Sequence, residues 1–237
     1  MSASFALGLK PARFALLALV VFALGACTMA NRRIETLARP AGDARIVVMP
    51  LDVELFELSA AGLPEPKADW TEAAKGHLLA AFEAEQAERR LDLDVLDEAA
   101  LPGEVLDDLH QIQSLHEAVG QTIRESGMIV LPTKKDKFDW TLGPRTAVLR
   151  DATGARYALF THIRDSYSSA GRVAMIIVAG MFGVGLPGGQ QVGFASLVDL
   201  ETGDVVWFNR LMRGNGDLRT AQAARETAGV LLTDLPR

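Results

Sequence analysis

Cysteine is nearly absent from this chain, since Cys27 is the single cysteine among 237 residues. No disulfide within the chain is therefore possible, and no further cysteine remains to bind a metal. The folded part must therefore be stable without a disulfide. The place of Cys27, close to the amino terminus, indicates a role in processing.

Histidines and nucleophile motifs are scarce as well. The four histidines are His77, His110, His116 and His162, and no His-Glu-x-x-His pattern occurs. His110 and His116 lie six residues apart, so on a helix they point about 120° away from each other. No Gly-x-Ser-x-Gly motif occurs, and the glycines at 180–189 are not followed by the Lys-Ser or Lys-Thr of a phosphate-binding loop. We therefore predict no metal, no cofactor and no catalytic residues, and we expect His162 to be a paired structural histidine.

An excess of positive charge is also lacking. The net charge at pH 7 is −6, and removal of residues 1–26, which hold two cations and no anion, makes it −8. Proteins that bind nucleic acid present a basic surface to the phosphates. The composition therefore excludes nucleic acid as an expected partner.

The amino terminus has the layout of a secretory signal. Lys10 and Arg13 form a positive region, and residues 14–26 form an uninterrupted run of apolar or small side chains. This run of 13 residues is shorter than the roughly 20 that span a bilayer. We therefore predict a signal peptide over residues 1–26.

The run ends in Leu24-Gly25-Ala26-Cys27, which resembles the bacterial lipobox. The resemblance implies cleavage after Ala26 and lipidation of Cys27, so that acyl chains hold the mature chain on a membrane. Thr28 stands where an aspartate would resemble the inner-membrane retention signal. We therefore expect a lipid-anchored protein on the periplasmic face of a bacterial outer membrane. The alternative is an uncleaved anchor followed by a buried free cysteine.

The mature chain is expected to consist of a polar tether, residues 27–44, and a single domain, residues 45–237. The first half of the domain predicts a buried strand at 46–49, an irregular loop at 51–68, a helix at 69–90, a strand at 91–96, a helix at 106–127 and a strand at 128–131. The second half predicts a charged loop at 133–144, a helical turn or strand at 145–150, a turn at 151–154, a strand at 157–163, a hairpin at 191–208 and a helix at 221–232. The first helix would begin with a capping box, Asp69-Trp70-Thr71-Glu72. This order favours an α/β fold with a mixed, mostly antiparallel sheet and helices packed on it.

Four segments within residues 45–235 form a further pattern. They are Ile46-Val47-Val48-Met49-Pro50, Gly154-Ala155-Arg156-Tyr157-Ala158-Leu159-Phe160, Ala195-Ser196-Leu197-Val198-Asp199-Leu200-Glu201-Thr202-Gly203-Asp204-Val205-Val206-Trp207, and a terminal alanine-rich helix ending in Leu-Leu. With the lipobox, they resemble bacterial envelope lipoproteins of the TolB amino-terminal-like fold, a group that includes the curli-secretion lipoprotein and activators of peptidoglycan synthases. The resemblance implies a scaffold, a partner-binding module or an oligomeric pore, without catalytic residues to carry over. The chain departs from the pore-forming members because it lacks a pair of long alternating strands for a shared barrel.

One segment lacks charge altogether, because no charged residue occurs from Val173 to Val198. Its most apolar and glycine-rich part, residues 173–189, includes Ile176, Ile177, Met181 and Phe182 as a possible interaction segment. Our first interpretation is a buried helix or strand beneath the sheet. The second is a hairpin that contacts a membrane or a neighbouring subunit. A transmembrane helix is disfavoured because the clean apolar run is too short.

These observations predict a non-enzymatic outer-membrane lipoprotein that binds envelope proteins, or copies of itself, at the periplasmic face. One alternative is a subunit of an oligomeric export or secretion assembly, with residues 173–189 in contact with the membrane or a neighbour. Another alternative, of a different class, is a cell-wall or polysaccharide enzyme.

Overall fold

The structure, a computed structural model, describes residues 30–32, 45–89, 91–126, 131–134, 137–214 and 217–236, with the backbone alone at 30–32. The predicted signal peptide, Cys27 and nearly all of the tether lie outside the described residues, as does most of the strand predicted at 128–131. In the part that is described, no helix combines the length and the apolar character needed to cross a membrane.

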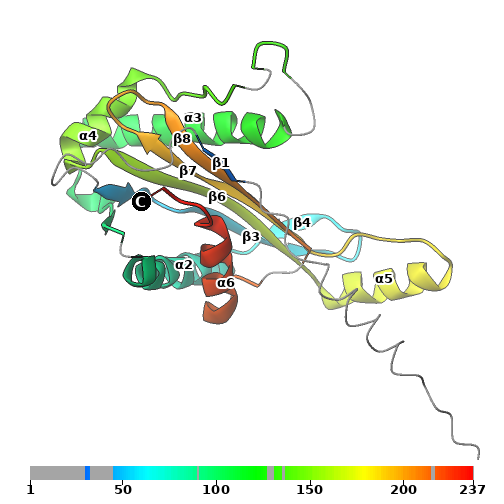
Figure 1. Cartoon of the computed structure of the whole chain (residues 1–237). Helices are drawn as coiled ribbons and strands as arrows, with labels where there is room; N and C mark the ends of the chain where they lie inside the picture. Colours follow the sequence, from blue (N-terminus) through cyan, green and yellow to red (C-terminus); the bar gives the residue numbers. More distant parts are fainter. Residues whose placement is uncertain are drawn as a thin grey trace, which may run out of the picture.

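Within the described residues, an eight-stranded mixed sheet forms the middle of the molecule (Figure 1). Its strands are β1 (Ala30–Arg32), β2 (Ile46–Val48), β3 (Asp52–Leu58), β4 (Pro64–Pro66), β5 (Leu93–Val95), β6 (Tyr157–Ser168), β7 (Gln191–Asp199) and β8 (Val205–Arg213). The main path runs β1-β8-β7-β6-β2-β5, and β3 joins it beside β6, with β4 outside β3. β2 pairs in parallel with β5 and β6, and β3 with β6, whereas the other four pairs are antiparallel. The predicted α/β class with a mixed, mostly antiparallel sheet is confirmed.

Strand β6 organises this sheet. One side of it pairs with β7 from Tyr157 to Asp165, while the other side pairs first with β2 and then with β3. Its first seven residues are buried in succession. Such a continuous buried run is typical of a strand covered on both faces.

The prediction of an irregular loop at 51–68 is wrong, because most of this segment forms β3 and β4. In β3, Val53 and Leu55 are buried while Glu54 is exposed, which is the alternation of a strand with one solvated face. The prolines that suggested a loop lie in β4, which pairs only with β3. An edge strand tolerates proline because its outer N–H groups have no partner strand.

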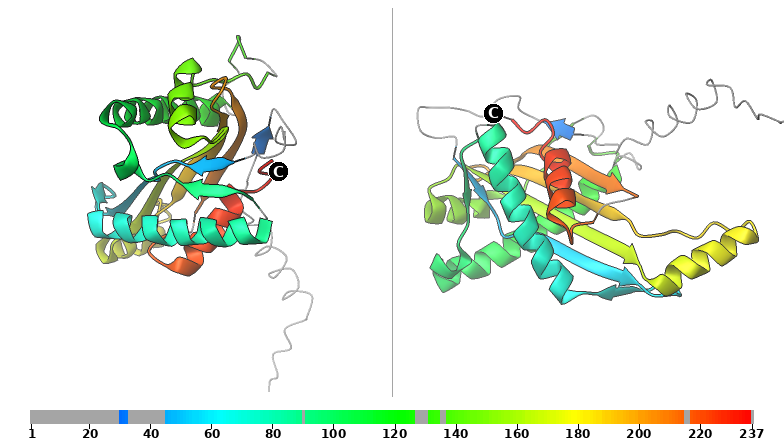
Figure 2. Two further views of the ribbon diagram at one scale, coloured as in Figure 1. Left: turned by 90° about the vertical axis from the view of Figure 1, so that its left-hand side faces the viewer. Right: turned by 90° about the horizontal axis from the view of Figure 1, so that it is seen from below.

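Helices cover both faces of the sheet (Figure 2). One face carries α2 (Ala68–Arg89) and α6 (Ala221–Leu231), and the other carries α3 (Gly103–Ser126) and α4 (Ala147–Thr153). Short 3-10 turns, η1 (Glu98–Ala100) and η2 (Pro144–Thr146), precede α3 and α4. Each face has its own apolar cluster: Leu78 and Trp207 belong to the first, Leu109 and Phe160 to the second.

Two local predictions about helix ends are corrected. Helix α2 begins at Ala68, before the expected capping box, and the Thr71 hydroxyl accepts a hydrogen bond from the Leu55 N–H at 3.0 Å. Thr71 therefore ties the helix to β3 instead of capping it. The turn expected at 151–154 is mostly the last turn of α4, and only Gly154, with φ of 69°, leaves the helix in the left-handed conformation.

The predicted hairpin is confirmed as β7 and β8, joined by a turn that ends in Gly203. Gly203 has φ of 79°, and a Cβ atom at this position would lie 2.1 Å from the Gly143 carbonyl oxygen. Glycine is therefore required here both by the backbone conformation and by the close approach of a second chain segment.

Candidate functional site: an apolar arm and a polar cluster

The connection between β6 and β7 leaves the sheet and forms an arm, residues 169–190 (Figure 1). Its first half is helix α5 (Ala170–Met181), and its second half returns to β7 outside regular structure. The Ser169 hydroxyl caps α5 by accepting a hydrogen bond from the Arg172 N–H at 3.2 Å. The Ser169 N–H donates to the Leu58 carbonyl at 3.0 Å, so the arm starts from a fixed point beside the end of β3.

Arg172 fastens the base of the arm. Its guanidinium is buried and donates through Nη2 to the Pro187 carbonyl at 2.9 Å, which joins the outgoing helix to the returning segment. The same guanidinium packs against Gly62, where a Cβ atom would lie 2.8 Å from Nη1. The base is therefore built into the domain.

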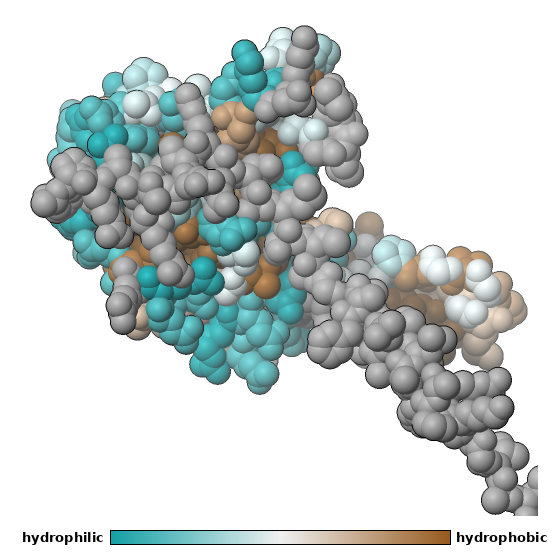
Figure 3. Space-filling model, in the orientation of Figure 1, coloured by the Kyte–Doolittle hydropathy of each residue, from teal (hydrophilic) through white to brown (hydrophobic). Residues whose placement is uncertain are grey.

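Beyond Arg172, the arm is apolar and open to solvent. Among the described residues, seven of the eleven exposed large apolar side chains belong to it, namely Val173, Met175, Ile177, Val178, Met181, Phe182 and Val184. Phe182 and Met181 are 81% and 80% exposed, and brown apolar surface follows the projecting arm in Figure 3. Soluble monomers rarely expose contiguous apolar patches beyond a few hundred Å². The tip of the arm therefore has the character of a contact surface.

Our first interpretation of residues 173–189, burial beneath the sheet, is wrong. Ile177 is 60% exposed, and Met181 and Phe182 lie at the open end of the arm. Of the four residues singled out in the sequence, Ile176 alone is partly covered, where its Cδ1 approaches Gly188 of the returning segment. The reason is geometric: the pairing of β6 with β7 ends at Asp165 and Gln191, and α5 continues past this end of the sheet. The other predicted site residues, Leu24, Gly25, Ala26 and Cys27, lie outside the described residues.

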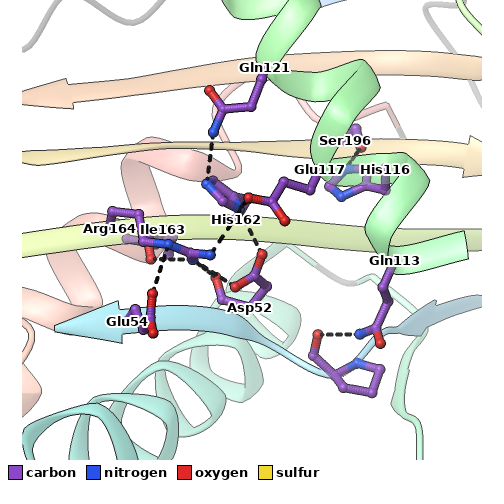
Figure 4. Close-up of polar contacts among 11 residues, drawn as sticks. Asp52, Glu54, Gln113, His116, Glu117, Gln121, His162, Ile163, Arg164 and Ser196 are labelled. Atoms are coloured by element: carbon purple, nitrogen blue, oxygen red, sulfur yellow. Dashed lines mark hydrogen bonds and ion pairs between the residues drawn. The ribbon is translucent and has the colours of Figure 1, made fainter. Parts of the chain in front are cut away.

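A second group of polar side chains lies between α3 and the sheet (Figure 4). This polar cluster consists of Asp52 and Glu54 of β3, Glu117 and Gln121 of α3, and His162 and Arg164 of β6. Asp52 and His162 are direct neighbours in the parallel ladder, and His162 Nδ1 lies 2.6 Å from Asp52 Oδ2. The Gln121 amide nitrogen contacts His162 Nε2 at 3.0 Å. The expected pairing of His162 is therefore confirmed.

Asp52 is the shared partner of the two β6 side chains. Burial alone would raise the pKa of Asp52, but hydrogen bonds from His162 and from Arg164, whose Nη1 lies 2.6 Å from Oδ1, outweigh it and hold the pKa at about 2. Arg164 also contacts Glu54 at 3.3 Å. Asp52 therefore stays ionised at neutral pH.

Glu117 is bound more loosely than Asp52. Its Oε1 lies 3.9 Å from both His162 Nδ1 and Arg164 Nη2, which is beyond hydrogen-bond distance. A depression of about 350 Å³ opens beside the polar cluster and is lined by Leu51, Asp52, His110, Gln113, Ser114, Glu117 and Arg164. Asp52 and Glu117 therefore face an open space, with the imidazole of His162 buried behind them.

Sequence reasoning missed the polar cluster because its members come from three distant segments, one of which was expected to be a loop. Asp52 and His162 are 110 residues apart, so no local spacing motif joins them. The available signal was alternation: Asp52 and Glu54 flank a buried valine in β3, as His162 and Arg164 flank a buried isoleucine in β6. Two neighbouring strands with this pattern place four polar side chains at one sheet surface.

Among protein-family models and curated proteins, none matches this chain. The solved structures similar to it include the PelC dodecamer from Paraburkholderia phytofirmans, at 12% identity and a TM-score of 0.41, covering 89% of this chain and 99% of that chain. A single-substitution variant of the PelC dodecamer from the same organism is similar at 13% identity and a TM-score of 0.41, with coverage of 89% and 99%. The LpoB C-terminal domain from Salmonella enterica is similar at 10% identity and a TM-score of 0.28, with coverage of 74% and 86%. At these sequence identities and TM-scores, none of the three similarities supports a conclusion about the function of this chain.

Proposed function

We propose that this chain is a non-enzymatic, lipid-anchored protein of the bacterial outer membrane that acts as a partner-binding module at the periplasmic face. The observation that carries the proposal is the apolar arm, which has a fixed base and an exposed tip. The lipobox supports the membrane location, since acylation of Cys27 would hold the domain within reach of other envelope proteins. In this function, the arm is the surface that a partner covers.

The backbone of the arm favours a protein partner over lipid. Within the described residues, the N–H groups of Gly185 and Leu186, which lie beyond the Arg172–Pro187 contact, make no hydrogen bond. In hydrocarbon, each unpaired backbone group costs several kcal/mol. A protein partner can satisfy such groups with its own backbone, as in the addition of a strand to an extended segment. We therefore assign the tip to an envelope protein or to a second copy of this chain.

A second candidate function is a subunit of an oligomeric export assembly. It is favoured by α5, which exposes apolar side chains around the helix and has no charged residue after Arg172. A helix that is apolar all round is normally covered in the working state of a protein. In a ring of copies, the tip of each arm would pack on the next subunit. The mass of the purified particle therefore distinguishes the two functions, because an adaptor is a monomer and an export assembly contains many copies.

Replacing Ile177 with aspartate is expected to abolish association while sparing the fold. Because the Ile177 side chain is exposed, a charge there should change the free energy of unfolding by no more than about 0.5 kcal/mol. The same charge would be desolvated in an apolar interface, which is strongly unfavourable. Light scattering after size-exclusion chromatography, together with crosslinking at position 181 in cells, measures association. Circular dichroism measures stability.

Val95→Asp is the matched control, because Val95 is a comparably exposed apolar residue on β5, an edge strand that pairs with β2 and not with the strands that carry the arm. It should associate like the native chain. If Ile177→Asp unfolds, the arm is core and the proposal is wrong. If the native chain associates with nothing and instead floats with vesicles in an Ile177-dependent manner, the arm binds lipid and the protein-partner assignment fails.

Lipidation at Cys27 has its own test. In cells fed a clickable fatty acid, the native chain is expected to be labelled, and Cys27→Ser is expected to lose the label and accumulate at the unprocessed mass. The reason is that the thiol of Cys27 is the only cysteine thiol in the chain. If Cys27→Ser were still labelled, lipidation at Cys27 would be contradicted, and the proposed membrane anchor would be wrong.

A further inference from the structure

Three side chains of the polar cluster present metal-ligating atoms to one another. One oxygen each of Asp52 and Glu117 and one ring nitrogen of His162 all lie within 4.8 Å of one another. The ligand atoms of a zinc-type ion lie roughly 3–3.5 Å apart, because each bond is about 2.0–2.2 Å long. The His162 nitrogen and the Asp52 oxygen share a hydrogen bond at 2.6 Å, which is closer than this spacing. Binding of an ion therefore requires loss of the shared proton and a small separation of the two atoms. Glu117 is half-exposed at the end of a flexible side chain, so a small rotation brings its carboxylate to the same point.

The charge of the polar cluster favours a cation. Three carboxylates, those of Asp52, Glu54 and Glu117, surround the single guanidinium of Arg164. With a neutral imidazole, this leaves a net charge of −2. A divalent ion would neutralise it, whereas Arg164 alone cannot.

A second layer of contacts orients the ligands. His162 is 3% exposed and stacks on Phe194, with ring centroids 4.9 Å apart, so its ring is held in place. When a metal takes Nδ1, the ring hydrogen resides on Nε2, where the Gln121 amide can accept it after turning its oxygen to the ring. Arg164 holds the other oxygen of Asp52. Partners of this kind fix the tautomer and the direction of metal ligands.

We propose that Asp52, Glu117 and His162 bind one divalent ion of the zinc type, with its open coordination position facing the 350 Å³ depression. One nitrogen and two carboxylates suit Zn²⁺ or Mn²⁺, whereas Mg²⁺ and Ca²⁺ prefer oxygen ligands only. The three ligands come from α3, β3 and β6, so the ion joins the helix to the sheet. This site is separate from the arm and independent of the proposed function.

The test is a titration of ZnCl₂ into the full chain, purified in detergent without a histidine tag and stripped with chelator. Calorimetry is expected to show one equivalent of Zn²⁺ per chain, with Mg²⁺ binding at least tenfold more weakly. Saturating Zn²⁺ is expected to raise the melting temperature, because the ion binds only the folded state. Glu117→Gln is the diagnostic variant, since Glu117 makes no contact shorter than 3.9 Å within the polar cluster. It should weaken Zn²⁺ binding at least tenfold and leave the metal-free melt unchanged.

Glu125→Gln is the control on the same helix, and it should bind Zn²⁺ like the native chain. Ile177→Asp should do so too, because the arm contributes no ligand. Absence of binding would overturn the proposal and leave the polar cluster as a structural brace. Binding that survives Glu117→Gln, or that Glu125→Gln weakens equally, would overturn it as well, because the ion would then be held elsewhere.

Discussion

Replacing Gly120 with alanine is expected to destabilise the protein by about 1–3 kcal/mol, whereas the same replacement at Gly76 is expected to stabilise it by about 0.5–1 kcal/mol. Both glycines lie inside long helices, Gly76 in α2 and Gly120 in α3. At Gly76, a Cβ atom would meet nothing within 4 Å, so alanine adds only its better helix propensity. At Gly120, a Cβ atom would lie 2.1 Å from Cε2 of Phe194. The space around each glycine therefore decides whether alanine raises or lowers the free energy of unfolding.

Phe194 has little freedom to move away from Gly120. Its ring is fully buried and lies between His162, at 4.9 Å, and Phe208, at 5.3 Å, with His116 at 5.4 Å. Relief of the clash would require α3 to lift from the sheet or Phe194 to leave its rotamer, and either change costs packing. The backbone of α3 at Gly120 thus lies directly against the Phe194 ring of the sheet.

Urea unfolding of Gly76→Ala, Gly120→Ala, Phe194→Leu and the double variant Gly120→Ala/Phe194→Leu measures these effects. The smaller leucine should make room for the added methyl group, so the double variant is expected to be more stable than the sum of the two single changes implies. Strict additivity would show that Gly120 and Phe194 do not compete for the same space. Equal stabilisation by both alanines would contradict the packing of α3.

The hairpin and β6 could be predicted because their local signals agree with their tertiary environment. Apolar side chains run through Tyr157, Leu159 and Phe160, and Gly203 marks the position in the β7–β8 turn that demands glycine. Residues 51–68 could not be predicted in the same way. Their prolines indicate a loop, and only the position of β4 at the edge of the sheet makes those prolines compatible with a strand.

The apolar arm shows a different limit. The apolar pattern predicts that the side chains of Ile177 and Met181 are removed from water, but it does not indicate whether their own domain or another molecule covers them. The answer depends on where β6 and β7 stop pairing, which is a tertiary property. The polar cluster is equally non-local, since Glu117 reaches Asp52 only after α3 has packed on the sheet.

Lowering the pH from 7 to 4 is expected to cost the native protein roughly 3 kcal/mol of unfolding free energy through His116 alone. The pKa of His116 is lowered from 6.5 to about 3, first by burial and then by the nearby His162, against an opposite effect of Asp52. In the unfolded chain the His116 imidazole is protonated near pH 6.5, whereas in the folded chain it is protonated only near pH 3. Between pH 6.5 and about pH 3, the unfolded state binds more protons than the folded state. The contribution of His116 to the free energy of unfolding is therefore complete above pH 6.5 and decreases as the pH is lowered through this range.

The matched variant is His116→Phe with Ser196→Ala, because His116 Nε2 lies 2.5 Å from Ser196 Oγ and a single change would leave that hydroxyl without its partner. Phenylalanine keeps the stack on Phe160, whose ring centroid is 4.8 Å away. Urea unfolding at pH 7, 5.5 and 4 should give the variant a shallower loss of stability than the native chain, by roughly 3 kcal/mol at pH 4. His110→Phe, a change at an exposed histidine of the same helix, should keep the native slope. Parallel pH profiles for the native chain and the double variant would mean that His116 titrates normally, and that its place between α3 and the sheet is open to water.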